Sequence, residues 1–288
     1  MQRGTNDSAL PQRLAVLRDR EFQQLSAFVY NEVGIKLPPA KKTMLEARLQ
    51  KRLKALQLQT FEEYTAYLFS SEGQLHELIQ MINVVTTNKT DFFREPAHFD
   101  YLVKTALPTL LEQRSERAKL RFWSAGCSTG EEPYTLLMVL AEFAEEQPGF
   151  EYSLLASDID TQVIEKARAA VYSEDRVDTI PLRLKKKYLL KSRDKTRSLV
   201  RIVPELRSRV QFRRINFMDD NFGITEQLDV IFCRNVIIYF DQATQERLMN
   251  KFYRNLAPGG YLFLGHSETL NGLDTPFRSV AATVYRKL

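Results

Sequence analysis

Residues 122–135, FWSAGCSTGEEPYT, decide the fold: an apolar run leads into a turn of small residues and then into the first turn of a helix. A turn of this kind before a helix usually offers free backbone N–H groups to a phosphate. Here Glu131 and Glu132 stand at the expected start of the helix, and two carboxylates repel a phosphate. The stretch therefore predicts a strand–turn–helix unit whose ligand accepts negative charge beside it.

Length and composition predict a globular protein with one large domain and a smaller one, since the 288 residues are 44% hydrophobic and 27% charged. No run reaches the roughly 18 apolar residues of a membrane span, and the N-terminal MQRGTNDSALPQRL lacks the apolar segment of a signal peptide. We therefore expect a cytoplasmic protein. Cys127 and Cys233 have no His or Cys partner at metal-ligand spacing, so we expect both to be small buried residues.

The positive charge is concentrated in one segment. The formal net charge is +5, yet residues 183–214 hold 13 Lys or Arg against 2 Asp or Glu. A nucleic-acid-binding protein that acts through its overall charge would be basic more evenly, although a local patch can still meet phosphates. We call residues 183–214 the basic island.

Helical periodicity covers the first part of the chain. Leu45, Leu49, Leu53 and Leu56 share one face at about 100° per residue and are predicted to be core. Gly34 follows the first helical pattern and is a predicted C-cap. The patterns cover residues 22–34, 41–58, 61–70 and 74–85. They predict an all-α domain over residues 1–85.

From Leu120 onward, short apolar runs alternate with helical stretches, which is typical of a doubly wound α/β sheet. We assign this second domain to residues 86–288. The basic island falls where a loop of about two to six residues is usual, so we predict a small antiparallel β insert at about 172–211. The predicted strands are 120–126, 152–160, 210–217, 228–240, 261–268 and 282–288, and the predicted helices are 133–146, 161–172 and 244–260.

Polar side chains follow these strands at the end where such sheets bind ligands. Asp158 and Asp160 end the second strand, Asn216 the third, and Arg234 with Asn235 the fourth. A carboxylate after the second strand suits the two hydroxyls of a ribose. The pattern therefore indicates a nucleoside cofactor.

The glycine turn distinguishes two such cofactors. A dinucleotide site uses G-x-G-x-x-G, whereas residues 126–130 read GCSTG, and the carboxylates that follow oppose a pyrophosphate. S-adenosylmethionine carries a sulfonium and an ammonium group and no phosphate. We therefore predict S-adenosylmethionine, with the glycines allowing close backbone approach and Glu132 beside positive charge. The alternative is that Glu131 and Glu132 only complement the helix dipole.

Four stretches closely resemble the CheR family of chemotaxis-receptor methyltransferases: TTNKTDFFREPAHF (86–99), WSAGCSTGEEPYT (123–135), ASDIDTQVIEKAR (156–168) and IFCRNVIIYFD (231–241). The resemblance extends over nearly the whole chain, including the N-terminal helices. It implies methyl transfer from S-adenosylmethionine to glutamate side chains in the cytoplasmic helices of chemoreceptors. It also implies that the all-α domain recognises the receptor.

The resemblance carries roles over to individual residues. Arg94 and Tyr239 correspond to the residues beside the transferable methyl group. Lys41, Arg48 and Arg52, which fall within a helical sector of roughly 40°, would dock on the acidic receptor bundle. The implied cofactor contacts are Asn88, Thr90, Arg94, Glu132, Asp158, Asn216, Phe217, Arg234 and Asn235.

A glutamate acceptor needs neither a general base nor a metal, because its carboxylate is already ionised at neutral pH. Alignment of the reacting groups can supply about 7 to 11 kcal/mol. Amine and base methylases of this fold often carry Asn/Asp-Pro-Pro-Tyr after the fourth strand, where this chain has CRNVIIYF, residues 233–240. We therefore expect no metal site. The arginine of this stretch suits either an anionic acceptor or the carboxylate of the cofactor.

Structural roles compete with several of these assignments. Arg94 can pair with Asp91 or Glu95, and Tyr239 can cap an apolar strand with its hydroxyl bonded. Rows of charge on a helix are usually solvated faces, and basic stripes meet phosphate equally well. His76, His98 and His266 are expected to have packing or surface roles.

Three other functions fit parts of the pattern: an RNA or small-molecule methyltransferase, a non-catalytic cofactor-binding docking module and, least well, a nicotinamide dehydrogenase. Family members that tether to a receptor pentapeptide tend to carry a glycine-rich loop in the insert, but KSRDKTRSLVRI (191–202) has no glycine. We expect independence from the tether, with no nucleic-acid partner. Arg193, Lys195 and Arg197 would then either keep the sheet edge soluble or steer the enzyme toward an acidic receptor or anionic membrane surface.

Overall fold

The computed structural model describes residues 14–113, 119–194 and 196–288, so Lys195 lies outside the described residues. The chain divides into two compact units. One contains the residues up to Asn31 together with Leu37–Val85, and the other contains Glu32–Lys36 together with Thr86–Leu288. Within the described ranges, no helix is both long and apolar enough to span a bilayer.

The first unit is helical, as the periodicity predicts. Its elements are α1 (Asp19–Val33), η1 (Pro39–Lys41), α2 (Lys42–Leu56), α3 (Phe61–Leu68), α4 (Ser71–His76) and α5 (Leu78–Val85). Helix α1 ends before Gly34, whose φ of 74° is the left-handed conformation expected of a C-cap glycine. Thr60 and Glu63 form a capping box at the start of α3.

Two details of this unit differ from the sequence prediction. The single helix predicted over residues 74–85 is interrupted at Glu77, which separates α4 from α5. Leu45, Leu49 and Leu53 are buried, but Leu56 near the end of α2 is only half-buried.

Glu77, where the helix is interrupted, takes part in a buried ion pair. The carboxylate of Glu77 is 1% exposed and accepts bonds from Arg52 Nε at 2.8 Å and Arg52 Nη2 at 2.6 Å. The hydroxyl of Tyr64 donates to the same carboxylate at 2.9 Å. Helix α2 therefore points Arg52 into the unit, and Arg48 likewise donates to the carbonyl of Val85. Lys41 is exposed.

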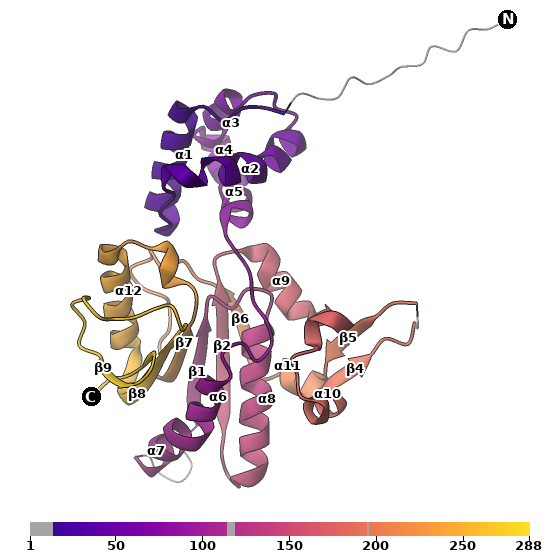
Figure 1. Cartoon of the computed structure of the whole chain (residues 1–288), viewed down its shortest axis with the longest axis vertical. Coiled ribbons are helices and arrows are strands. Elements are labelled where there is room, and N and C mark those ends of the chain that lie inside the picture. Colours follow the sequence, from indigo (N-terminus) through magenta and orange to yellow (C-terminus); the bar gives the residue numbers. More distant parts are fainter. Residues whose placement is uncertain (1–13, 114–118, 195) are drawn as a thin grey trace, which may run out of the picture. The chain divides into compact units, whose positions relative to one another are not determined.

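The second unit is built on a seven-stranded sheet in the order β6-β2-β1-β7-β8-β10-β9, visible in the lower part of Figure 1. Strands β6, β2, β1, β7 and β8 are parallel, and β10 and β9 are antiparallel to their neighbours. The strands are β1 (Leu120–Ala125), β2 (Tyr152–Asp158), β6 (Val210–Arg214), β7 (Leu228–Cys233), β8 (Leu256–Leu264), β9 (Arg278–Ala281) and β10 (Val284–Arg286). This is the predicted doubly wound sheet.

Helices cover both faces of this sheet. Strand β1 shows the alternation: Leu120 and Phe122 belong to one apolar cluster, and Trp123 and Ala125 to the other. The first cluster includes side chains of α6 (Ala97–Tyr101), α7 (Leu107–Glu112), α8 (Glu131–Glu146) and α9 (Thr161–Ala169), and the second includes those of α12 (Gln242–Asn255). The sequence analysis did not predict α6, the π-helical turn η2 (Leu102–Ala106), α7 or β9.

A three-stranded antiparallel sheet forms the predicted insert, on the right of Figure 1. Strand β5 (Leu199–Ile202) pairs with β3 (Val171–Ser173) on one side and with β4 (Leu189–Lys191) on the other. The insert also holds η3 (Glu174–Val177), α10 (Leu182–Tyr188) and α11 (Pro204–Arg207). Most of the basic island therefore belongs to this insert, and its last residues form β6 of the main sheet.

Arg52→Ala should lower the free energy of unfolding of the helical unit by about 3 to 5 kcal/mol, because it leaves the buried carboxylate of Glu77 without its cation. Lys41→Ala, at an exposed side chain, should change that free energy by no more than about 0.5 kcal/mol. Urea denaturation measures both variants. An Arg52→Ala protein as stable as the wild type would contradict the role given to this ion pair.

Candidate functional site

The turn after β1 takes its shape from two glycines that have left-handed φ angles, 87° for Gly126 and 99° for Gly130. A Cβ on Gly126 would lie 2.6 Å from Val236, and one on Gly130 would lie 2.8 Å from the hydroxyl of Tyr172. These close neighbours belong to the chain itself. The glycines therefore permit the turn and its packing on the neighbouring segments, and the close approach of their backbone to a cofactor stays a prediction.

Asp158, at the carboxyl end of β2, binds the turn. Its carboxylate is 8% exposed and accepts the N–H of Ser128 at 2.8 Å and that of Asp160 at 3.0 Å. Burial raises the pKa of Asp158 to about 6, even though these backbone bonds favour the ionised form.

Asn88 connects the segment after α5 (Leu78–Val85) to the same place. Its side-chain amide donates to Asp160 at 2.7 Å, and its carbonyl accepts the hydroxyl of Ser128 at 2.9 Å. Asp160 in turn caps α9 by accepting the N–H groups of Gln162 and Val163. Asn88 and Asp158 therefore lie at one site, joined through the turn after β1.

Each of the two glutamates that begin α8 has an arginine partner. Glu132 accepts Arg234 Nε at 2.7 Å and the hydroxyl of Ser124 at 2.7 Å. Glu131 accepts Arg176 Nη2 at 2.7 Å and the hydroxyl of Thr129 at 2.6 Å. The carboxylate of Glu132 is thus offset by a cation of the protein itself, which the sequence interpretation did not anticipate.

Arg94 lies between two residues in the left-handed region, Phe93 with φ 53° and Glu95 with φ 57°. Such conformations cost energy in residues other than glycine and often mark functional segments. The guanidinium of Arg94 donates to the carbonyl of Lys89 at 3.3 Å and remains about one-third exposed. Thr90, in the same segment, is buried and its carbonyl accepts Arg176.

The segment after β7 carries the remaining predicted residues of this unit. Arg234 is buried and donates to the carbonyl of Arg94 at 2.7 Å, which joins the Arg94 segment to β7. Asn235 has a φ of 59°, and Tyr239 follows in η4 (Ile237–Tyr239), half-buried. No hydrogen bond to the Tyr239 hydroxyl occurs within the described ranges, so the proposed capping bond of that hydroxyl is not formed.

Asn216 and Phe217 follow β6, but their side chains are engaged elsewhere. The amide of Asn216 donates to the carbonyl of Glu32 at 2.7 Å, and its oxygen accepts the N–H of Met218. Phe217 packs edge-on against Trp123 and Phe252. Lys41, Arg48 and Arg52 belong to the helical unit, so the structure describes them apart from this site.

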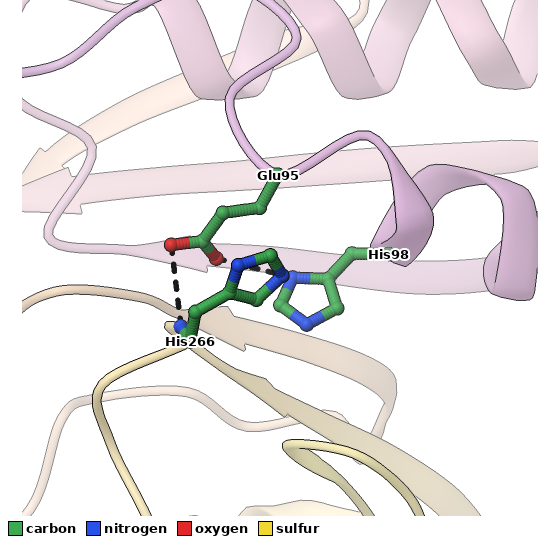
Figure 2. A group of neighbouring side chains, drawn as sticks. All are labelled: Glu95, His98 and His266. Atoms are coloured by element: carbon green, nitrogen blue, oxygen red, sulfur yellow. Dashed lines mark hydrogen bonds and ion pairs between the residues drawn. The ribbon is translucent and has the colours of Figure 1, made fainter.

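Glu95, His98 and His266 form a cluster whose possible ligand atoms lie within 4.8 Å of one another (Figure 2). Arg234 Nη1 lies 3.2 Å from His98 Nδ1 and 3.4 Å from Glu95 Oε2. Glu95 Oε2 and His98 Nδ1 are themselves 3.4 Å apart, so the guanidinium contacts both atoms at once, and its charge repels a second cation. Glu95 and His98 of this cluster accept from Arg234, which gives His98 a specific contact where the sequence predicted a packing or surface role.

The ionisation of this cluster follows from the arginine. Burial works to raise the pKa of Glu95, but the His266 N–H and the charge of Arg234 outweigh it and lower that pKa. Burial and Arg234 together lower the pKa of His98 to about 4. Neutral His98 can thus accept from Arg234 through Nδ1 while Nε2 bonds the hydroxyl of Thr283 at 2.8 Å.

Sequence reasoning missed Glu268, which is 3% exposed just after β8. Its carboxylate accepts backbone N–H groups of Gly265, Asn235, Val236 and Ile237. The only signal in the sequence is a carboxylate four residues after the apolar run of β8, and that gives no indication of its partners.

His98 should stay neutral down to about pH 5, because its pKa lies near 4 and not at the ordinary 6.5. Between pH 6.5 and 4 the unfolded chain binds a proton here that the folded chain does not. His98 therefore lowers the free energy of unfolding as pH falls through this range, by up to about 3 kcal/mol. NMR titration of the ring, assigned with His98→Asn, measures the pKa. A midpoint near 6.5 would contradict the contact with Arg234.

Two family models match the chain, one after the other. The description "CheR methyltransferase, all-alpha domain" matches residues 20–86, and "CheR methyltransferase, SAM binding domain" matches residues 88–286. The second unit is therefore an S-adenosylmethionine-binding methyltransferase domain, and S-adenosylmethionine is its cofactor.

Similar proteins cover nearly the full chain. The chemotaxis protein methyltransferase of Borreliella burgdorferi is 42% identical over 93% of this chain and 94% of its own. That of Salmonella typhimurium is 38% identical over 96% and 92%, and that of Escherichia coli is 38% identical over 96% and 93%. Among solved structures, PKMT2 from Rickettsia typhi in complex with AdoHcy is 19% identical, with a TM-score of 0.31 over 52% of this chain and 21% of that chain.

Proposed function

Because the chain belongs to the CheR methyltransferase family, we propose that it methylates glutamate side chains in the cytoplasmic helices of chemoreceptors. The products would be glutamate methyl esters and S-adenosylhomocysteine, and the reaction would take place in the cytoplasm. The observation that carries this proposal is the similarity, across more than nine-tenths of the chain, to proteins named chemotaxis protein methyltransferase.

The residues of the second unit fit the cofactor. A carboxylate has about four lone-pair positions, and Asp158 uses two of them for the N–H groups of Ser128 and Asp160. The others can accept ribose hydroxyls. The guanidinium of Arg94, about one-third exposed, can bind the carboxylate of the methionine part. The domain boundaries we propose are residues 1–85 and 86–288.

The remaining assigned residues support the site in different ways. Asn88 and Thr90 belong to the segment that lies over the turn after β1 and is held there by Ser128 and Arg176. Glu132 holds Arg234, and Arg234 holds the peptide of Arg94. Since the amide of Asn216 is bound to Glu32, we assign its cofactor contact, and that of Phe217, to backbone groups.

Methyl transfer to a carboxylate requires the protein to align the acceptor oxygen with the methyl group of the cofactor. S-adenosylmethionine supplies an electrophilic methyl group, and an ionised glutamate accepts it without losing a proton. Arg94 is in a backbone segment fixed by Arg234 and by Thr135, whose hydroxyl accepts the N–H of Phe93 at 3.1 Å. The hydroxyl of Tyr239 is available to contact the acceptor. The side chains of Arg94 and Tyr239 would hold the carboxylate of the acceptor glutamate and exclude water.

Receptor docking would use the helical unit. Lys41 is exposed and available for it, whereas Arg52 is held by Glu77. We therefore propose that Arg52 shapes the docking helix from inside, while Lys41 meets the receptor. Arg48 is half-buried and can do both.

The basic island is less available to partners than its composition suggests. Lys187 pairs with Glu142 and Glu145, Lys185 with Asp178, and Arg197 with Asp194. These pairs offset part of its charge. We propose that the insert gives only weak steering toward an acidic surface and that the enzyme works without a pentapeptide tether.

The test uses tritiated S-adenosylmethionine with receptor-containing membranes. Label in the receptor that mild alkali releases as volatile methanol identifies a methyl ester and supports the proposal. Alkali-stable label, or label in RNA or metabolites, would support the rival methyltransferase. Cofactor binding with no S-adenosylhomocysteine formed would support a docking module.

Asp158→Asn should weaken S-adenosylmethionine binding by about 1.5 to 3 kcal/mol, because it removes a charged acceptor of the ribose hydroxyls. Glu165→Gln is the matched control, since Glu165 is an exposed carboxylate on α9 paired with Arg168. Calorimetry measures both affinities. Equal affinity of Asp158→Asn and the control would remove Asp158 from the ribose site.

A further inference from the structure

Glu268 gathers four backbone N–H groups around one buried carboxylate. Oε2 accepts from Gly265 at 2.6 Å and from Asn235 at 2.8 Å, and Oε1 accepts from Val236 at 2.7 Å and from Ile237 at 2.8 Å. The residue is 3% exposed. Burial raises its pKa, while the four backbone bonds favour the ionised form.

Three of these donors are consecutive. Asn235 is left-handed with φ 59°, and Val236 is right-handed with φ −117° and ψ −47°. Successive N–H groups in such a pair point to one side and form a concavity that binds an anion. In this molecule the anion is the side chain of Glu268. Without it, three neighbouring donors would lose their acceptor at once, and each buried donor left unpaired costs about 1 to 3 kcal/mol.

The end of β8 (Leu256–Leu264) also packs directly on the same segment. A Cβ on Gly265 would lie 2.5 Å from Asn235 Nδ2 and 2.8 Å from Asn235 N. No side chain fits in that space. Gly265 and Glu268 therefore fix the backbone of Asn235 from one side by contact and by hydrogen bonds.

We propose that Glu268 is a positioning residue for methyl transfer, acting through the segment from Arg234 to Tyr239. That segment begins with the arginine that binds Glu132 and the Arg94 peptide, and it ends with the tyrosine assigned to the acceptor. Glu268 holds Asn235 in its left-handed conformation. It thereby fixes how the chain runs toward Arg234 on one side and toward Tyr239 on the other. The part of this inference that concerns Tyr239 rests on the proposed function. The part that concerns Arg234 and Asn235 depends only on cofactor binding.

The experiment compares four variants of the full-length protein. Glu268→Gln removes the charge, and Glu268→Asp keeps the charge on a shorter arm. Gly265→Ala presses on Asn235 without any change of charge. Asp229→Asn is the matched control: Asp229 is a fully buried carboxylate in β7 that accepts a backbone N–H, that of Arg121 at 2.7 Å, outside the segment from Arg234 to Tyr239.

Calorimetry with S-adenosylhomocysteine and receptor methylation at saturating cofactor are the readouts, both scaled to the folded fraction seen by circular dichroism. Glu268→Gln and Gly265→Ala should each weaken the binding of S-adenosylhomocysteine at least tenfold and lower kcat at least tenfold. The KM for the receptor should stay within about twofold of the wild-type value. Glu268→Asp should recover part of both losses. Asp229→Asn should lower the melting temperature while affinity and kcat stay within about twofold.

The proposal would be overturned if the Glu268→Gln protein kept the affinity and kcat expected of the Asp229→Asn control. It would also be overturned if both variants lost affinity and kcat to the same extent. If Glu268→Gln does not fold, Glu268→Asp and Gly265→Ala decide by the same thresholds. The calorimetric readout needs no acceptor. A wild-type protein that binds S-adenosylhomocysteine but does not methylate receptors would therefore refute the proposed function and leave the role of Glu268 to be decided by affinity.

Discussion

The buried ion pair between Arg234 and Glu132 is the interaction on which the site depends. The two side chains meet at 2.7 Å, with the guanidinium 2% and the carboxylate 10% exposed. Breaking such a pair leaves an uncompensated buried charge, which typically costs about 3 to 5 kcal/mol. Arg234 also binds the peptide of Arg94 and contacts Glu95 and His98. One guanidinium thus joins α8, β7 and the Arg94 segment.

Buried carboxylates provide the rest of the frame. Asp158 holds the turn after β1, Asp160 holds Asn88 and caps α9, and Glu268 holds the segment after β7. Each bonds groups of a different segment, so the loops at the carboxyl edge of the sheet are fixed mainly by acids and backbone N–H groups. Such a frame leaves the guanidinium of Arg94 about one-third exposed, although its Nε also lies 3.9 Å from Glu95 Oε1. Among the described residues it leaves the Tyr239 hydroxyl without a hydrogen bond.

Residues of one type received different roles from their surroundings. Helical spacing places Arg48 and Arg52 on one face of α2, which predicted that both dock on the receptor. In the structure, Arg52 is bound by a buried glutamate 25 positions away, and Arg48 donates to the carbonyl of Val85. Asn216 lies after its strand, near the predicted end, but its amide donates to the carbonyl of Glu32. His98, expected to have a packing or surface role, accepts a bond from Arg234. In each case the partner is remote in sequence, and no periodicity reports it.

The sequence by itself determined the all-α domain, the doubly wound sheet and its insert, because local periodicity and apolar runs specify elements and their order. It also placed Asp158, Arg234 and Asn235 at one edge, since parallel strands end together. Only the tertiary structure decided which charges neutralise which: Glu132 with Arg234, Glu131 with Arg176, Glu77 with Arg52. It alone revealed Glu268. Pairing of buried charges depends on distances between segments far apart along the chain, and those distances exist only once the sheet has formed.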